Sequence, residues 1–231
     1  MKITTTELVF ADSFEFDPGP IDVIITDPPY ALDKDGNMLG HLSPNHLEKA
    51  THMRGYIDND RERYQAFLDR FFERSYQQLP GNGLLLSFMG NRTADQLLSS
   101  GTQAGFTLMD IIVFTGGGGF AKSMTTLMPR HELCAFFRKE GAPKRRINPD
   151  WNRKNHFDAP KTKKAKLHPT GKPIAWMDYL VETFSEPGET VYDPFAGSGT
   201  TLYSARKARR NSIGVENDPE YYKEARRILD V

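Results

Sequence analysis

The stretch Ile24-Ile25-Thr26-Asp27-Pro28-Pro29-Tyr30 ends a run of β-branched apolar residues that begins at Ile21. Such a run predicts a strand that is buried on both faces of a sheet. The two prolines end the strand, because proline has no N–H to donate and restricts the residue before it. The turn therefore presents a carboxylate, two carbonyls without a following N–H and an aromatic ring at the carboxyl end of a strand, where open α/β sheets bind their ligands. These groups suit a planar ligand that carries an exocyclic amine; the plainer alternative is a buried strand that ends in a Pro-Pro turn.

Short apolar strands and amphipathic helices alternate along the rest of the chain. We expect further strands at 7–12, 84–88, 107–115, 133–137, 190–193 and 212–216, and helices at 59–80, 93–104, 172–185, 200–209 and 219–229. Helices between short apolar strands predict an α/β fold, a doubly wound and mostly parallel sheet, in one domain over 1–231. Residues 31–58 are polar and interrupted by glycine and proline, which predicts a long loop that is mobile without ligand.

The charge of the chain is unevenly distributed. Its formal net charge is zero, but residues 138–172 hold 12 Lys and Arg against 3 Asp and Glu, a net charge of +9. A basic block on an acidic body favours a polyanionic partner, and a solvated loop is the alternative. We expect little regular structure over 138–166 and interpret 138–167 as a short basic insertion that would contact such a partner.

The composition excludes several classes of protein. Cys134 is the only cysteine, so a disulfide framework within the chain and a four-cysteine zinc site are excluded, and we expect no metal. No apolar run approaches the roughly 18 residues of a membrane helix, and the N-terminal residues lack the apolar core of a signal peptide. A cytoplasmic protein without membrane contact is the simplest interpretation.

A second motif, Asp193-Pro194-Phe195-Ala196-Gly197-Ser198-Gly199-Thr200-Thr201, lies between an expected strand and an expected helix. Its glycines allow close approach of the backbone to a ligand and a sharp turn into the helix. Glu216 ends the next strand, about where a nucleoside-binding unit places the acid that binds ribose. Leu202 stands where a dinucleotide fingerprint has its last glycine, so the pattern favours an adenosyl group without a pyrophosphate.

Together with His168-Pro169-Thr170-Gly171-Lys172-Pro173, the two motifs resemble those of the DNA amino-methyltransferases, which methylate exocyclic amines in DNA with S-adenosylmethionine. The order, with Asp-Pro-Pro-Tyr before the glycine loop, is similar to the permuted β group of that family. The resemblance implies a circularly permuted Rossmann-like methyltransferase fold, in which Leu8–Asp12 supplies the strand beside that of Glu216. It also implies DNA as partner, and dimers are common in the group.

The resemblance assigns roles to individual residues. The catalytic set is Asp27, Pro28, Pro29 and Tyr30. The cofactor-binding set is Asp12, Thr170, Lys172, Asp193, Phe195, Gly197, Ser198, Gly199 and Glu216, with Asp12 near the adenine, Glu216 on the ribose hydroxyls and Lys172 approaching the cofactor carboxylate. The DNA-binding set comes from the basic segment: Lys144, Arg145, Arg146, Arg153, Lys154, Lys163 and Lys164.

Several functions stay open on the sequence alone. Adenine N6 is the favoured target, because Asp rather than Ser precedes Pro-Pro-Tyr. Cytosine N4 is the alternative within the same chemistry; an RNA or protein amine methyltransferase and a non-catalytic nucleic-acid-binding module are the others. Methylation of cytosine C5 is disfavoured, because it needs a nucleophilic thiolate and Cys134 lies in an apolar strand. A member of the resembled family needs a segment outside the sheet to recognise its target in DNA, and we assign the basic insertion 138–167 to this role. Because the insertion is short, we expect a short recognition sequence or relaxed specificity. A link to a restriction–modification system stays open.

Overall fold

The computed structural model describes residues 4–30, 61–116, 130–141, 145, 147, 154–158 and 171–231. Its strands are β1 (Thr6–Phe10), β2 (Val23–Thr26), β3 (Leu84–Met89), β4 (Phe106–Thr115), β5 (His131–Lys139), β6 (His156–Asp158), β7 (Thr190–Asp193) and β8 (Asn211–Glu216). Its helices are α2 (Arg61–Gln78), α3 (Ala94–Gln103), α4 (Ile174–Phe184), α5 (Thr200–Lys207) and α6 (Pro219–Leu229). The predicted alternation of strands and helices is confirmed in these residues.

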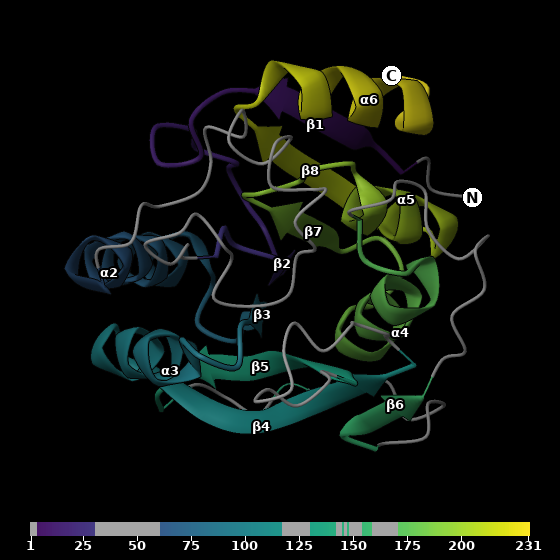
Figure 1. The fold of residues 1–231 in the computed structure, drawn as a ribbon. Coiled ribbons are helices and arrows are strands. Elements are labelled where there is room, and N and C mark those ends of the chain that lie inside the picture. The colour runs from purple at the N-terminus through teal and green to yellow at the C-terminus, as the bar shows by residue number, and fades with distance from the viewer. Residues whose placement is uncertain are drawn as a thin grey trace, which may run out of the picture.

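The strands form one eight-stranded sheet in the order β1-β8-β7-β2-β3-β5-β4-β6, seen edge to edge in Figure 1. The first five strands in this order are parallel, and β5 runs antiparallel to both β3 and β4. Strand β1 pairs with β8 from Thr6 with Ser212 to Phe10 with Glu216, so the N-terminal strand completes the sheet beside the C-terminal one as predicted. The doubly wound, mostly parallel fold is thereby confirmed, while its origin by circular permutation stays a prediction.

The two faces of β2 pack against different helices. Val23 and Ile25 belong to a core with α4, whereas Ile24 belongs to a core with α2 and α3. Successive side chains of a strand point to opposite faces, so an unbroken apolar run is what a strand covered on both sides requires. Figure 1 shows these two groups of helices on opposite sides of the central strands. This packing fixes β2 in the middle of the sheet, with Asp27 immediately after its carboxyl end.

The basic segment contains regular structure at two places where we expected little. Strand β5 continues to Lys139, and residues 156–158 form β6, which pairs with β4 and is the last strand of the sheet. The loop 31–58 and most of 138–167 lie outside the described residues, so the expectations for them stay predictions. No helix among the described residues is long and apolar enough to cross a membrane.

Candidate active site

The two sequence motifs meet at the carboxyl edge of the central strands β2 and β7. These strands are parallel neighbours, so the turns that follow them emerge side by side. The Thr26 hydroxyl donates to Asp193 Oδ1 at 2.7 Å, and the Thr201 hydroxyl donates to Asp193 Oδ2 at 2.6 Å. The buried carboxylate of Asp193 therefore connects the strand before the Asp-Pro-Pro-Tyr turn with the first turn of α5.

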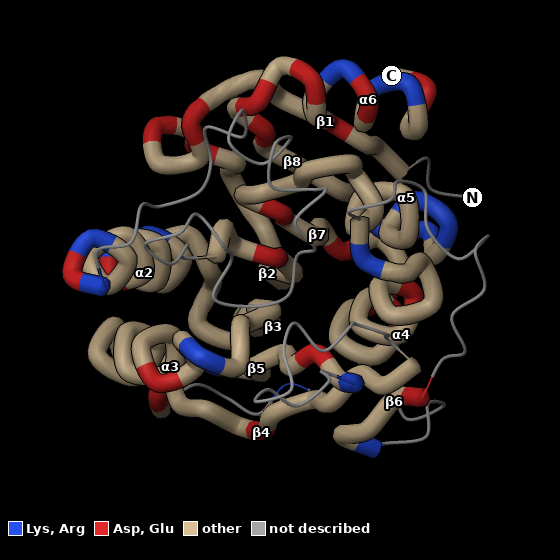
Figure 2. Tube along the Cα trace, viewed as in Figure 1, with Lys and Arg blue, Asp and Glu red and all other residues tan. Residues whose placement is uncertain are grey.

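A cavity of about 190 Å³ lies where the motifs meet. Asp27 and Pro29 line it from the first motif, Gly197 and Ser198 from the second, and Glu216 from the end of β8. Figure 2 shows acidic positions at β2 and β7 in the middle of the molecule, while most of the described Lys and Arg lie at its periphery. The two sequence motifs therefore line one cavity, although they lie far apart in the sequence.

The glycine loop is held by the carboxylate of Glu216. Gly197 N–H donates to Glu216 Oε2 at 2.8 Å, and the N–H groups of Asn217 and Asp218 donate to Oε1 at 2.9 and 2.8 Å. Gly197 and Gly199 have φ of +53° and +79°, a conformation that glycine adopts without steric cost. Burial raises the pKa of Glu216, and the three N–H groups oppose that rise. At Gly197 the loop therefore lines the cavity with backbone alone.

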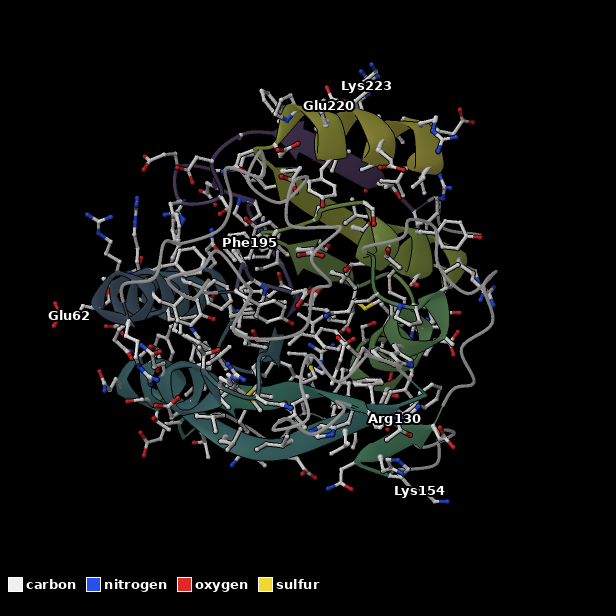
Figure 3. The ribbon with its side chains drawn as sticks, viewed as in Figure 1. Glu62, Arg130, Lys154, Phe195, Glu220 and Lys223 are labelled. Atoms are coloured by element: carbon white, nitrogen blue, oxygen red, sulfur yellow. The ribbon has the colours of Figure 1, made fainter. Side chains whose placement is uncertain are left out.

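The ring of Phe195 lines the cavity and packs against other aromatic rings. The Phe195 ring lies 5.6 Å from the rings of Phe67 and Phe71 of α2 and 6.4 Å from that of Phe14. Figure 3 shows Phe195 between α2 and the ends of β7 and β8. The apolar face that α2 buries therefore serves both the core and the site, because it fixes the orientation of a cavity-lining ring.

The groups of the Asp-Pro-Pro-Tyr turn form a hydrogen-bonded cluster. The Tyr30 hydroxyl donates to Asp27 Oδ1 at 2.6 Å, and Lys172 Nζ lies 3.0 Å from Asp27 Oδ2 and 2.6 Å from Glu132 Oε2. Burial raises the pKa of Tyr30 well above 10, and the charge of Asp27 adds to this effect, so the phenol stays protonated as a donor. The structure thus places Lys172 beside Asp27 and in the lining of the same cavity.

The remaining cofactor-binding predictions have different outcomes. Asp12 follows β1 next to the end of β8, where its carboxylate accepts the Phe14 N–H at 2.9 Å, which closes a local turn. Ser198 is buried, with its hydroxyl 3.3 Å from that of Thr200. Thr170 lies outside the described residues. Their contacts with a cofactor stay predictions.

Two of the residues predicted to bind DNA are described. Arg145 donates to the Asp22 carbonyl and forms an ion pair with Glu189, with only 9% of its side chain exposed. Because Asp22 and Glu189 precede β2 and β7, this contact lies at the opposite edge of the sheet from Asp27. Lys154 is exposed beside β6, away from Phe195 in Figure 3. The other five residues, Lys144, Arg146, Arg153, Lys163 and Lys164, lie outside the described residues.

Sequence reasoning missed two residues of the site. Thr26 precedes the motif and looks like an ordinary strand residue, yet its hydroxyl contacts Asp193. Glu132 lies at the beginning of β5, and its role depends on β5 running antiparallel, which brings that end of the strand to the carboxyl edge of β3. The sequence offers a signal for Thr26 alone, because this residue directly precedes Asp27 of the first motif.

Other chemistries find little support among the described residues. No group of three or more His, Cys, Asp or Glu in this part of the chain is arranged to hold a metal ion. Cys134 is fully buried in β5, and burial raises the pKa of its thiol far above the usual value. It is an inert core residue, as the sequence predicted, so it cannot serve as the thiolate of a C5 methyltransferase.

Comparisons with known proteins agree with the geometry. A model of a DNA methylase family, N6_N4_Mtase, matches residues 21–227. The type II methyltransferase M.HpaI of Haemophilus parainfluenzae is 28% identical over 239 residues, which cover 91% of this chain and 68% of that protein.

Solved structures show the same fold. The structure of an M1.HpyAVI–SAM complex aligns with a TM-score of 0.71 and 22% identity over 97% of this chain and all of that one. PvuII DNA methyltransferase, described as cytosine-N4-specific, aligns with a TM-score of 0.72 and 18% identity over 98% of this chain and 92% of that one.

Proposed function

The chain belongs to the DNA methylase family, and from this premise we propose that it transfers a methyl group from S-adenosylmethionine to adenine N6 in DNA. One observation carries the proposal: Asp27 and Glu216, from motifs at opposite ends of the sequence, line the same cavity. The carboxylate suited to the target amine and the carboxylate suited to the cofactor ribose therefore open into the same cavity.

The lining of the cavity fits S-adenosylmethionine. Its described charged groups are the carboxylates of Asp27, Asp193, Glu216 and Asp218 and one ammonium, that of Lys172. An acidic lining favours a cationic ligand, and the glycine loop leaves room for its sugar and chain. Glu216 Oε2 receives one N–H in this structure, so it has acceptor capacity for a ribose hydroxyl.

Glu216 and the loop at Gly197 would hold the cofactor, which would supply a methyl group on a positively charged sulfur for the lone pair of the target nitrogen. We assign Asp27 and the Pro28 carbonyl as acceptors for the two N–H groups of the amine, a contact that would orient its lone pair. Tyr30 offers a ring on which a flipped base stacks.

The choice of base rests on Asp27. The first residue of the tetrapeptide is Asp rather than Ser, which in the resembled family accompanies adenine more often than cytosine. Cytosine N4 is the second candidate, because its amine presents the same two N–H groups and because PvuII DNA methyltransferase shares the fold.

Identification of the methylated nucleoside tests the proposal. Unmethylated DNA is incubated with the protein and isotope-labelled cofactor, digested to nucleosides and analysed by mass spectrometry. We expect labelled N6-methyldeoxyadenosine from the wild type and none from Asp27→Ala. Labelled N4-methyldeoxycytidine would show that the target is cytosine N4, the second candidate. Labelled 5-methyldeoxycytidine, or DNA without label, would contradict the proposal.

We assign DNA binding to the basic segment, without Arg145. Exchange of Lys144 and Arg146 for glutamine should weaken DNA binding. It should also reduce the slope of log affinity against log salt concentration by about 0.9 for each phosphate that is no longer neutralised. Cofactor affinity should stay unchanged. An unaltered slope would contradict this assignment and would leave the segment as a solvated loop that does not bind DNA.

Two further assignments complete the proposal. A protein that acts on cellular DNA is expected in the cytoplasm of its host, which cell fractionation measures. A homodimer follows from the resemblance alone, and light scattering on the purified chain tests it.

A further inference from the structure

The ammonium of Lys172 lies inside a cluster of charges rather than in solvent. Its side chain is 13% exposed, whereas those of Asp27 and Glu132 are 33% and 37% exposed. Besides the two carboxylates, Nζ lies 3.3 Å from the Tyr30 hydroxyl and 4.7 Å from the centre of the Phe88 ring. A lysine is placed so deeply only when its charge is matched by partners.

The antiparallel strand β5 brings the second carboxylate to this cluster. Leu133 pairs with Met89 at the end of β3, so Glu132, the preceding residue, reaches the carboxyl edge of the sheet although it lies near the start of its own strand. Lys172 comes from the segment before α4, and Asp27 from the turn after β2. Three separate segments therefore converge on one ammonium group.

The charges in this cluster act on Asp27 in opposite directions. Burial raises the pKa of Asp27, the Lys172 ammonium lowers it, and the Glu132 carboxylate raises it further. Burial would lower the pKa of Lys172, but the carboxylates of Asp27 and Glu132 outweigh burial and hold that pKa well above its usual value. Lys172 is therefore a permanent cation at the pH of the cell.

Other titratable groups that face Asp27 come from neighbouring elements. Tyr30 lies in the same turn, Asp193 on β7, Cys134 on β5 and Tyr64 on α2. Burial raises the pKa of Tyr64 to about 12 and that of Cys134 still further, so both are neutral. Within the part of the chain that the structure describes, Lys172 is the cation in contact with Asp27.

We propose that Lys172 is a positioning residue that keeps Asp27 ionised and oriented as the acceptor for the target amine, and that Glu132 holds Lys172 in this place. The inference rests on the proposed function, since it assigns a purpose to the ionised Asp27. Lys172 shares its hydrogens between two carboxylates, and the shorter contact, 2.6 Å, goes to Glu132. Glu132 thus prevents the ammonium from saturating Asp27, which keeps acceptor capacity for the amine.

The pH dependence of methyl transfer distinguishes this role from a purely structural one. Lys172→Met should lower the rate at neutral pH by roughly tenfold or more and move the acidic limb of the rate profile to higher pH, because Asp27 loses its counter-ion. Glu132→Gln should move the same limb to lower pH, because a like charge is removed. Lys172→Arg keeps the cation and should return the limb toward that of the wild type.

Direct titration of Asp27 separates failure of this inference from failure of the proposed function. Carbon-13 NMR of protein labelled at the aspartate carboxyls, with Asp27→Asn for assignment, follows Asp27 without any methyl transfer. Opposite displacements of its titration in the Lys172→Met and Glu132→Gln proteins are expected. Displacements in the same direction, or none in a folded variant, would overturn the inference whether or not the protein methylates DNA.

Cofactor affinity distinguishes a Lys172 that acts on Asp27 from a Lys172 that binds the cofactor carboxylate. If Lys172 serves Asp27, calorimetry should show S-adenosylmethionine binding to Lys172→Met within a few-fold of the wild type. A loss of tenfold or more with an unmoved titration of Asp27 would instead assign Lys172 to the cofactor carboxylate, as the sequence motif alone implied, and would overturn the inference.

Discussion

Replacement of Asp193 by asparagine should change how the stability of the protein depends on pH. The Asp193 side chain is 2% exposed and accepts hydrogen bonds from the Thr26 hydroxyl, the Thr201 hydroxyl and the Phe195 N–H. Burial raises the pKa of Asp193 from 3.8 to about 6, although these three donors oppose the rise. The folded protein therefore holds the proton of Asp193 more tightly than the unfolded chain does.

The sign and size of the effect follow from this displacement. Stability from Asp193 is fully present below pH 3.8 and is lost as the pH rises through about 6. At about 1.4 kcal/mol per pKa unit, the loss between about pH 4 and pH 7.5 is on the order of 2–3 kcal/mol. Asparagine carries no charge, so Asp193→Asn should gain that amount relative to the wild type over the same interval.

Urea unfolding of both proteins at a series of pH values measures the difference in their free energies of unfolding. The contributions of the other carboxylates are the same in both proteins and cancel in this difference. Thr201→Val removes one donor to the same carboxylate, so its stability relative to the wild type should fall as the pH rises. A difference between Asp193→Asn and the wild type that stays constant with pH would refute the reasoning. It would mean that Asp193 is solvated or otherwise compensated in the folded state.

Further substitutions test the glycine loop and the edges of the sheet. Glu216→Ala should weaken S-adenosylmethionine binding by roughly 1–3 kcal/mol in calorimetry, and Glu216→Gln by less, since one acceptor remains; unchanged affinity would remove Glu216 from the site. Gly199→Ala should cost about 1–3 kcal/mol in urea unfolding, because a Cβ would meet a side chain of α6 at 3.1 Å in addition to the positive φ. In the matched Gly197→Ala the Cβ would meet only a backbone oxygen at 4.0 Å, an ordinary contact, so this variant should cost only the backbone strain. Arg145→Gln should lower stability by about 1–3 kcal/mol and leave the salt dependence of DNA binding unchanged; a reduced salt slope would return Arg145 to the DNA-binding set.

Much of the fold was accessible from the sequence because it depends on local patterns. The β-branched run before Asp27 predicts a strand covered on both faces, and the spacing from Gly199 to Glu216 predicts a strand–loop–helix–strand unit. Parallel strands end at a common edge, and the pairing of β2 with β7 in the structure brings both motifs to one region of the molecule.

The interactions that the sequence did not predict depend on features that periodicity does not encode. The pattern of β5 predicts a strand but not its direction, and Glu132 reaches the cluster around Asp27 only because that strand is antiparallel. Arg145 carries the charge expected of a DNA contact, yet it pairs with Glu189 at the far edge of the sheet. Charge composition alone does not distinguish a basic residue that binds phosphate from one that closes the fold.

The most direct test measures single-turnover methyl transfer by Asp27→Ala, with saturating cofactor and with enzyme in excess over DNA. It asks whether Asp27 binds the amine while the glycine loop and Glu216 bind the cofactor. We predict that the variant binds S-adenosylmethionine within a few-fold of the wild type. It should transfer the methyl group at least about a hundredfold more slowly, since misplacement of the reacting group by about 1 Å costs on the order of this factor. A folded Asp27→Ala protein that transfers the methyl group at the wild-type rate, or that loses cofactor binding outright, would contradict this division of roles.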